Sequence, residues 1–402
     1  GATPYLHLSN PYPNGLNQPP GNALGLLNDV GYDAIGPIRT MIRTPYLQSW
    51  SLGVEHQFPW SVLLDVEYIG KKGTHLYFGG ANSLNHLGRQ VESYSSDQLN
   101  ALYTMVDNPF YGVITDPNSS LAYPTVSELQ LELPYPQFTG VITDVPAIAN
   151  SIYHGLQVTA EKNYSNGLQF LLTYTWSKSI DNSSTDDDNI TWLGGFLSLQ
   201  NPNDTKAERS LSSFDVPQVL QASYTYDLPI GRGKTFFPNM PRVAQAVVGG
   251  WKTNGVWRIS AGRPLGFQVA DGISLPTYGT QRPNLAGKPK RNTSPDWIDN
   301  NFFANPEVFL RPDDYTLGTA PRTMGDVRSP KSSDVDLSLE KDFSLESLRK
   351  GMSAEFRIEA QNAFNHPVFG SPSTSVDSDD FGLVTYTANG PREVQLGLKI
   401  SF

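Results

Sequence analysis

A strict alternation of apolar and polar residues constrains the fold of this chain more than any other feature, and it is clearest at the C-terminus. In residues 392–402, Val394, Leu396, Leu398, Ile400 and Phe402 fall on one face of an extended strand, while polar residues and a glycine separate them. This period of two is typical of a strand with one face in lipid and the other in water. A soluble edge strand could show the same alternation, but it would rarely end the chain on an exposed phenylalanine.

The alternation recurs along the chain and predicts nine strands from about Tyr46 onward. A tilted strand of about ten residues crosses a bilayer. The sequence Ser165-Asn166-Gly167 lies between two of these segments and is a strong signal for a tight hairpin turn. The segments begin at Trp50, Val62, Leu156, Leu168, Leu220, Trp257, Val335, Met352 and Val394.

The connections between these strands alternate in length. Short turns are predicted at Pro59, 165–167 and 344–351, with an intermediate link at 229–250. The long irregular stretches are 79–151, 181–216, 262–332 and 366–391. Long structureless loops are uncommon in compact soluble domains. Outer-membrane barrels combine short periplasmic turns with long external loops.

The strand count gives a prediction about the whole molecule. If Phe402 ends in the periplasm, nine strands place residues 1–45 outside as an external loop segment, and residues 46–402 form barrel wall. Bacterial single-chain barrels have even strand numbers. We therefore expect an all-β fold, an antiparallel transmembrane β-barrel with long extracellular loops, of which this chain is the C-terminal part.

Composition narrows the function classes. The chain has no cysteine, a formal net charge of −10 and no basic stripe, so we expect neither a thiolate metal site nor nucleic-acid binding. No apolar run approaches the ~20 residues of a membrane helix, but barrel strands do not produce such runs. The opening residues contain no signal peptide, so we expect a mature form or a fragment of an exported protein.

Six segments in order resemble the C-terminal half of TonB-dependent outer-membrane receptors, and the closest subgroup is the Oar-like receptors with an N-terminal carboxypeptidase-regulatory-like domain. The resemblance implies a barrel of about 22 strands closed by an N-terminal plug. It also implies import driven through contact with TonB. No plug domain or TonB box is recognisable, so we expect TonB coupling only through a missing N-terminal barrel and plug portion. The segments are Thr44–Leu76, Tyr153–Ser183, Arg209–Lys234, Gly249–Leu265, Glu355–Gly370 and Val394–Phe402.

No catalytic constellation emerges, and we expect neither enzymatic activity nor a cofactor. Charged residues on the polar faces of the strands are predicted to face the lumen. They could pair across the ladder, or they could contact the plug or a passing substrate. This set consists of Arg258, Asp336, Glu340, Glu355, Arg357, Glu359 and Lys399.

The long loops hold two kinds of candidate site. Loop aromatics could stack on sugars or bind apolar ligand groups, or they could pack on one another. The acidic run Asp186, Asp187 and Asp188 is a weak candidate for Ca²⁺, with a solvated acidic loop as the alternative. The aromatic candidates are Phe110, Tyr111, Trp192, Phe196, Trp297, Phe302 and Phe303.

These observations predict a protein of the outer membrane of a Gram-negative-type bacterium, with nutrient uptake by TonB-dependent transport as its function. The expected partners are outer-membrane lipid and the barrel-assembly machinery, which would read Phe402 as an insertion signal. The sequence also fits two alternatives. One is a plug-less porin or surface adhesin, and the other is a soluble secreted glycan-binding β protein.

Overall fold

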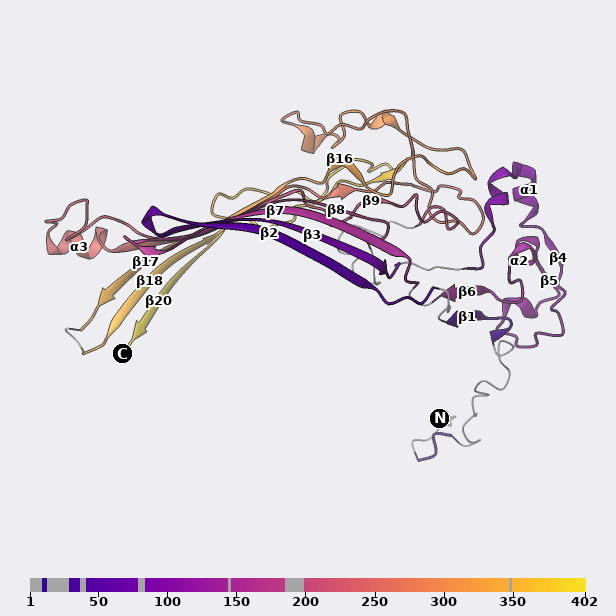
Figure 1. Ribbon diagram of the computed structural model, residues 1–402, viewed down its shortest axis with the longest axis horizontal. Helices are drawn as coiled ribbons and strands as arrows, with labels where there is room; N and C mark the ends of the chain where they lie inside the picture. The colour runs from indigo at the N-terminus through magenta and orange to yellow at the C-terminus, as the bar shows by residue number, and fades with distance from the viewer. Residues whose placement is uncertain are drawn as a thin grey trace, which may run out of the picture. The chain divides into compact units, whose positions relative to one another are not determined.

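The main feature of the computed structural model is a wide antiparallel sheet of ten strands (Figure 1). The structure describes residues 9–12, 29–36, 41–78, 84–143, 146–184, 199–346 and 349–402. Nine strands follow one another in chain order across the sheet, and the short β9 (Ser210–Leu211) pairs with β8. They are β2 (Tyr46–Phe58), β3 (Val62–Leu76), β7 (Ala149–Ser165), β8 (Leu168–Asp181), β10 (Gln218–Asp227), β11 (Trp251–Ser260), β17 (Ser332–Ser344), β18 (Ser353–Gln361) and β20 (Glu393–Ser401). The nine predicted strands and the antiparallel all-β architecture are confirmed.

Tight turns join the strand pairs at one end of the sheet. Asn166 and Gly167 both have positive φ, at 53° and 79°, as the predicted two-residue hairpin turn requires. The short turn η2 (Pro59–Ser61), in which Trp60 and Ser61 have positive φ, joins β2 to β3. The β10–β11 link is longer and contains the helix α3 (Arg242–Val248). The C-terminal end of β20 lies at this same end, because Ser401 pairs with Ser353 at the start of β18.

The strand register is strongly staggered across the sheet. Phe58, the last residue of β2, starts a line of directly paired residues that ends at Val394, the second residue of β20. From β2 at one edge of the sheet to β20 at the other, the pairing register therefore shifts along the strands by most of a strand length. Closing a sheet into a barrel requires this kind of stagger, with strands tilted by about 35–45°. The line passes through Val62, Lys162, Phe170, Tyr224, Gly255, Leu337 and Ala360.

The sheet is open between its first and last strands. In the part of the chain that the structure describes, β2 pairs only with β3, and β20 pairs only with β18. The sequence predicted that these two strands would not close a barrel on their own. Their exposed edges leave rows of unpaired backbone groups, which proteins rarely leave uncovered.

The two faces of the sheet differ in polarity, as the alternation predicted. Phe356 of β18 pairs with Leu398 of β20, and Glu355 pairs with Lys399 on the opposite face. Apolar side chains such as Leu52 and Leu398 are 75% and 67% exposed. Ala149 is the sheet's one buried hydrophobic residue among those described. The sheet therefore has almost no hydrophobic core of its own.

The long connections form a packed assembly at the other end of the strands, which we call the loop assembly (residues 199–216, 261–331 and 366–391). Its core contains Leu265, Phe267, Met324 and Val327, with several further aromatic rings. Its regular elements are short: β12 (Pro264–Leu265), β13 (Gln268–Val269), β14 (Asn284–Leu285), η6 (Trp297–Asp299), η7 (Pro306–Val308), β15 (Phe309–Leu310), β16 (Met324–Arg328) and β19 (Ser375–Val376). The 3-10 helix η3 (Arg89–Ser93) belongs to the same compact unit of the chain as the sheet.

A second compact unit comprises residues 1–36, 83–87 and 94–144. The sequence predicted an external loop up to residue 45 and an irregular stretch from 79 to 151. The structure instead pairs β1 with β6 in parallel and packs a small core of Ile114, Leu121 and Val126. The elements of this unit are β1 (Asp33–Gly36), α1 (Ser96–Ala101), β4 (Met105–Asp107), η4 (Ser120–Ala122), β5 (Thr125–Ser127), α2 (Glu128–Glu132) and β6 (Gly140–Thr143).

Within the described residues, no helix is both long enough and apolar enough to span a membrane.

Candidate functional site: the polar face and the long loops

The strand register places all seven predicted lumen-facing charges on one face of the sheet. Glu340 of β17 pairs directly with Arg357 of β18, and Glu355 pairs with Lys399. Arg258 of β11 and Asp336 of β17 lie on the same face, because Arg258 pairs with Asp334, two residues from Asp336. Together they make one side of the sheet hydrophilic across four neighbouring strands.

Arg357 is the centre of an ion-pair cluster on this face. Its guanidinium lies 3.2 Å from Glu340, 2.7 Å from Glu355 and 3.2 Å from Glu359. Its side chain is 42% exposed, so solvent screens these pairs, and each is worth about 0–1 kcal/mol. Only the Glu340 pair crosses the ladder, because Glu355 and Glu359 lie on the same strand as Arg357. One cation neutralises only part of three carboxylates, so the cluster remains negative.

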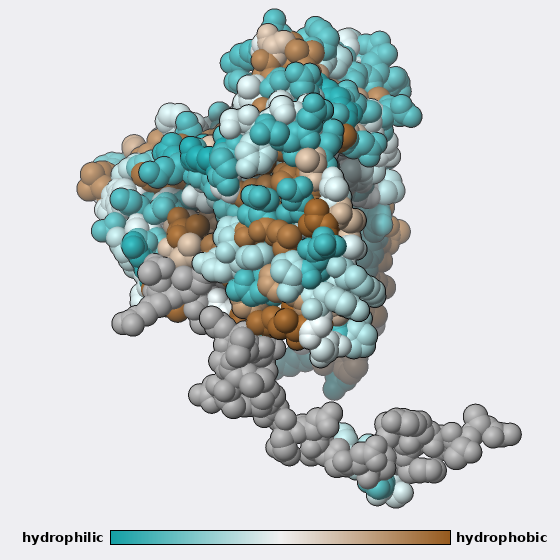
Figure 2. Space-filling view, turned by 90° about the vertical axis from the view of Figure 1, so that its right-hand side faces the viewer, coloured by the Kyte–Doolittle hydropathy of each residue, from teal (hydrophilic) through white to brown (hydrophobic). Residues whose placement is uncertain are grey.

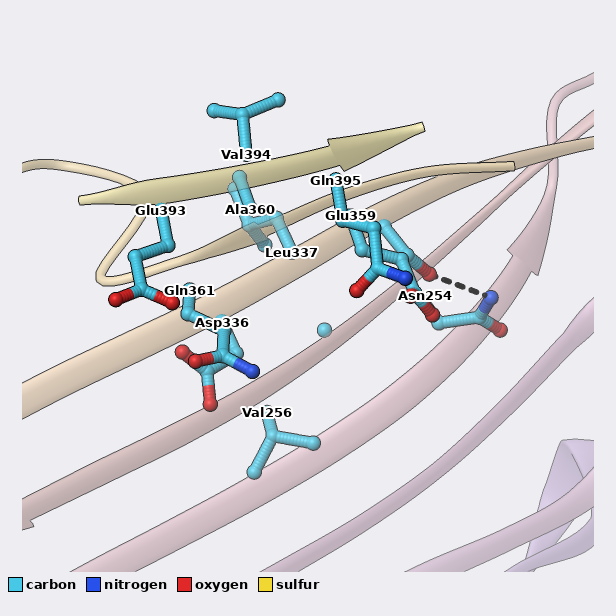
Figure 3. A pocket seen from close by; sticks show the side chains of 12 residues that line it. Asn254, Val256, Asp336, Leu337, Glu359, Ala360, Gln361, Glu393, Val394 and Gln395 are labelled. Carbon is cyan, nitrogen blue, oxygen red and sulfur yellow. Dashed lines mark hydrogen bonds between the residues drawn. The ribbon is translucent and has the colours of Figure 1, made fainter. Parts of the chain in front are cut away.

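A cavity of about 310 Å³ opens on the polar face beside this cluster. Asp336, Glu359 and Glu393 line it, together with the amides of Asn254 and Gln395. Figure 3 shows Glu393 and Asp336 on one side of the strands, whereas Val394 points to the other. Asn254 Nδ2 donates to Ser338 Oγ at 3.0 Å. The walls thus offer carboxylates and amides, which suit hydroxyl-rich or cationic groups.

A larger cavity, of about 660 Å³, lies where the loop assembly meets the strand ends. Its lining includes Arg263, Asp380 and the phenol-bearing Tyr386. The Ser378 hydroxyl donates to Asp380 and holds the pKa of that carboxyl below its ordinary value. Asp380 is therefore ionised at neutral pH. This cavity presents charges of both signs and polar backbone to the solvent.

Two of the aromatic residues predicted as candidate ligand contacts, Phe302 and Phe303, lie in the core of the loop assembly. Phe302 and Phe303 are 0% and 1% exposed, and their ring centroids lie 5.4 Å apart in an edge-on contact. Trp297 is half-buried against Phe302, and the Arg291 guanidinium lies 5.1 Å from the Phe302 ring. These contacts support the self-packing alternative for Phe302 and Phe303. Neither ring is available to a ligand in this structure.

The other predicted loop residues have different surroundings. Phe110 is half-buried against the small core of the second compact unit, and the neighbouring Tyr111 is 59% exposed. Trp192, Phe196 and the acidic run at 186–188 lie outside the described residues. Among the residues that are described, no group of three or more metal-ligating side chains comes together.

A network of buried ion pairs joins the segments of the loop assembly, and no pattern in the sequence predicts it. Arg322 pairs with Asp181, and Arg282 pairs with Glu208, all four side chains being at most 6% exposed. A third pair joins Arg328 to Asp215 at 2.7 Å. The partners are 74 to 141 residues apart in the chain, so no local spacing could identify them.

The side-chain amide of Gln200 and the hydroxyl of Ser184 extend the same network. Gln200 Oε1 accepts from the backbone N–H groups of Arg282 at 2.8 Å and Gly318 at 3.2 Å. Arg322 also donates to the Ser184 hydroxyl at 2.6 Å. Buried charges need such partners, because an unpaired charge in a low-dielectric interior is costly. The network therefore fixes the ends of the long loops to β8.

Comparison with known proteins identifies the family. A family model described as an outer membrane beta barrel domain matches residues 1–395. The chain belongs to this family. No curated protein matches it. Among solved structures, the outer membrane transporter YddB from Escherichia coli is similar, at 9% identity and a TM-score of 0.41. The match covers 90% of this chain and 33% of that one, so the chain spans about a third of that transporter's length.

Membership places the chain in the outer membrane, as the sequence predicted. The apolar face of the sheet then lies against lipid, and the polar face points away from it. This location overturns the soluble secreted alternative. Phe402 follows the last strand at the end where the short turns lie, and its ring is 82% exposed. The Arg349 guanidinium lies 5.8 Å from that ring.

Proposed function

We propose that the chain supplies wall and external loops to a TonB-dependent transporter that takes up nutrients across the outer membrane. The observation that carries this proposal is the staggered, open sheet with a lipid face and a polar face. A staggered sheet of this kind forms the wall of a larger barrel when further strands pair with β2 and β20. The polar face then lines the lumen, and the plug and TonB box belong to the part of the receptor that completes the barrel.

The site chemistry supports passage of a polar solute. The smaller cavity is lined by carboxylates and side-chain amides. The larger one is lined by Arg263, Asp380, Tyr386 and several serine and threonine residues. The loop assembly has a packed core, so it can present a defined surface to a ligand. Hydrophilic residues predominate on the side of the molecule seen in Figure 2, with scattered hydrophobic patches. We infer binding and gated passage, without bond chemistry.

Transport in cells tests this proposal. The complete receptor containing this chain would be expressed in a Gram-negative host with and without functional TonB. We expect uptake of the receptor's nutrient to require TonB and the proton-motive force. Uptake that persists without TonB, together with steady ion conductance in a planar bilayer, would support a plug-less porin instead.

The terminal residue has a separate proposed role. We propose that the barrel-assembly machinery recognises the exposed Phe402 at the end of β20 as an insertion signal. Phe402→Asp should then lower the amount of heat-modifiable receptor in the outer membrane. Equal amounts of wild type and variant would show that Phe402 is an ordinary strand residue.

A further inference from the structure

The link between β10 and β11 contains a helix whose solvent-facing side is apolar. In α3, Val243 and Val247 are 80% and 65% exposed, and Ala246 between them is also exposed. The polar Gln245 instead points toward the protein, where its Oε1 accepts from the Arg232 backbone N–H at 2.7 Å. A surface helix in water shows the reverse arrangement, with polar residues outward. The exposed side of α3 therefore suits an apolar surrounding.

Two residues of the apolar sheet face hold α3 in place. Trp251 Nε1 donates to the Val247 carbonyl at 2.9 Å. Lys341, which pairs with Trp251 across the ladder, donates through Nζ to the carbonyls of Gln245 and Gly249. Both side chains lie on the same face as Phe356, and the Trp251 and Phe356 rings are 6.3 Å apart. The helix is thus fixed on the lipid side of the sheet, at the end that carries the short turns.

The β2–β3 turn repeats this arrangement. Lys162 also lies on the apolar face, paired with Val62, and its Nζ donates to the Trp60 carbonyl and to Ser165 Oγ. The Trp60 side chain is 80% exposed. Tryptophan concentrates at membrane–water interfaces. Two buried lysines therefore donate hydrogen bonds to turn carbonyls on the lipid side, and apolar side chains next to them are exposed.

The segment between β10 and β11 (residues 228–250), which we call the α3 link, carries positive charge. From Leu228 to Gly250 the chain has the basic residues Arg232, Lys234 and Arg242 and no acidic residue. Lys234 Nζ lies 4.0 Å from the carboxylate of Asp227, the last residue of β10. Phe236 and Phe237 in the same link are 55% and 67% exposed. An exposed apolar helix flanked by basic residues is typical of segments that lie in the interfacial layer of a membrane.

We propose that the α3 link is an interfacial anchor, embedded in the anionic phospholipid headgroup layer at the short-turn side of the outer membrane. The apolar side of α3 contacts the outer part of the acyl chains, and the basic residues contact lipid phosphates. The anchor continues the lipid face of the sheet beyond the strand ends. This inference rests on the outer-membrane location and does not depend on TonB-dependent uptake.

Fluorescence quenching in vesicles tests the anchor. Because this chain has no cysteine, Val247→Cys introduces a single thiol into it, to which a polarity-sensitive fluorophore is attached. The complete receptor, with any cysteines elsewhere replaced, is reconstituted in phosphatidylethanolamine and phosphatidylglycerol vesicles. Nitroxide-labelled lipids report contact with the membrane, and iodide reports contact with water. Asp342→Cys is the matched control, because Asp342 adjoins Lys341 in β17 but lies on the polar face.

We expect nitroxide lipids to quench the label at position 247 several-fold more than the label at 342, with iodide giving the opposite order. Replacing phosphatidylglycerol by phosphatidylcholine should weaken lipid quenching at 247. Equal iodide quenching at both positions, or protection of 247 from both quenchers, would overturn the anchor. Unchanged quenching without anionic lipid would overturn the headgroup contact. If Val247→Cys does not give heat-modifiable protein, Val243→Cys serves as the second variant.

Discussion

The sheet and the loop assembly of this protein use hydrophobic residues in opposite ways. In the sheet, Leu396 and Leu398 are each 67% exposed, and backbone ladders join neighbouring strands. In the loop assembly, Phe267 and Phe302 are 2% and 0% exposed within a shared aromatic core. The sheet therefore depends on lipid to cover its apolar face, whereas the loop assembly covers its own. Substitutions that look equivalent in sequence should affect the two regions differently.

The largest expected difference concerns removal of an aromatic ring from the loop core. Phe302→Ala should lower the free energy of unfolding of the loop assembly by about 3–5 kcal/mol, because it leaves a cavity in a packed core. Protease cleavage within residues 261–331 of the membrane-embedded protein measures this opening. Leu398→Ala is the control, because its exposed side chain leaves no internal cavity. If both variants resist protease as the wild type does, the loop core is not stabilising.

Breaking the buried ion pair should have the next largest effect. Arg322→Met leaves Asp181 without its cation in a buried site, and removing one partner of such a pair costs about 3–5 kcal/mol. Hydrogen exchange of residues 199–216 should become faster, with no change in the ladders β17 to β20. The double variant Arg322→Met with Asp181→Leu should recover part of the protection. A double variant that exchanges faster than the single one would show that the pair itself is not the relevant contact.

A charge placed on either face of β20 tests the sheet directly. Leu398→Arg should reduce insertion, because arginine near the bilayer midplane costs about 2–4 kcal/mol on a lipid-facing strand. Gln395→Arg, on the polar face of the same strand, should be tolerated. The measurement is the amount of heat-modifiable protein in the outer membrane. Equal losses from both variants would mean that the two faces are not in different environments.

The smallest effect should come from Tyr278, which lies in the loop assembly. Its hydroxyl donates to Glu92 at 3.0 Å, and burial together with this carboxylate raises its pKa from 10 to about 12. Because the folded-state pKa is raised, the associated stability is fully present below pH 10 and is lost as the pH rises toward 12. Tyr278→Phe should cost about 0.5–1.5 kcal/mol at neutral pH, the value of a typical hydrogen bond.

Ultraviolet titration of the phenols checks this assignment. The difference between the wild type and Tyr278→Phe should be one phenol that ionises near pH 12. A missing phenol that ionises near pH 10 would contradict the raised pKa of Tyr278.

The two regions also differ in how far the sequence predicts them. Period-two alternation identifies the faces of β18 and β20 correctly, because each side chain's face depends only on its position along the strand. The Asn166-Gly167 turn is predictable for the same local reason. The pairing of Arg322 with Asp181 is not, because loop folding brings together residues 141 apart. The fold of the second compact unit is not predictable in this way, since its strands have only three or four residues and no clear period.

The loop aromatics show most clearly what cannot be predicted from the sequence alone. Sequence alone left Phe302 and Phe303 equally suited to ligand contact and to packing, and only their complete burial separates these alternatives. Likewise, the apolar positions of α3 are visible in the sequence, but their exposure depends on how Trp251 and Lys341 hold the helix.

Site-directed spin labelling along β20 tests the central claim, that one face of the sheet meets lipid and the other meets water. Single cysteines at positions 394 to 400 would carry a nitroxide label in the complete receptor, reconstituted in vesicles. We predict that accessibility to oxygen, which is concentrated in the bilayer, peaks at 394, 396, 398 and 400. Accessibility to a water-soluble nickel chelate should peak at 395, 397 and 399. Two profiles that rise and fall together, with no period of two, would contradict the account.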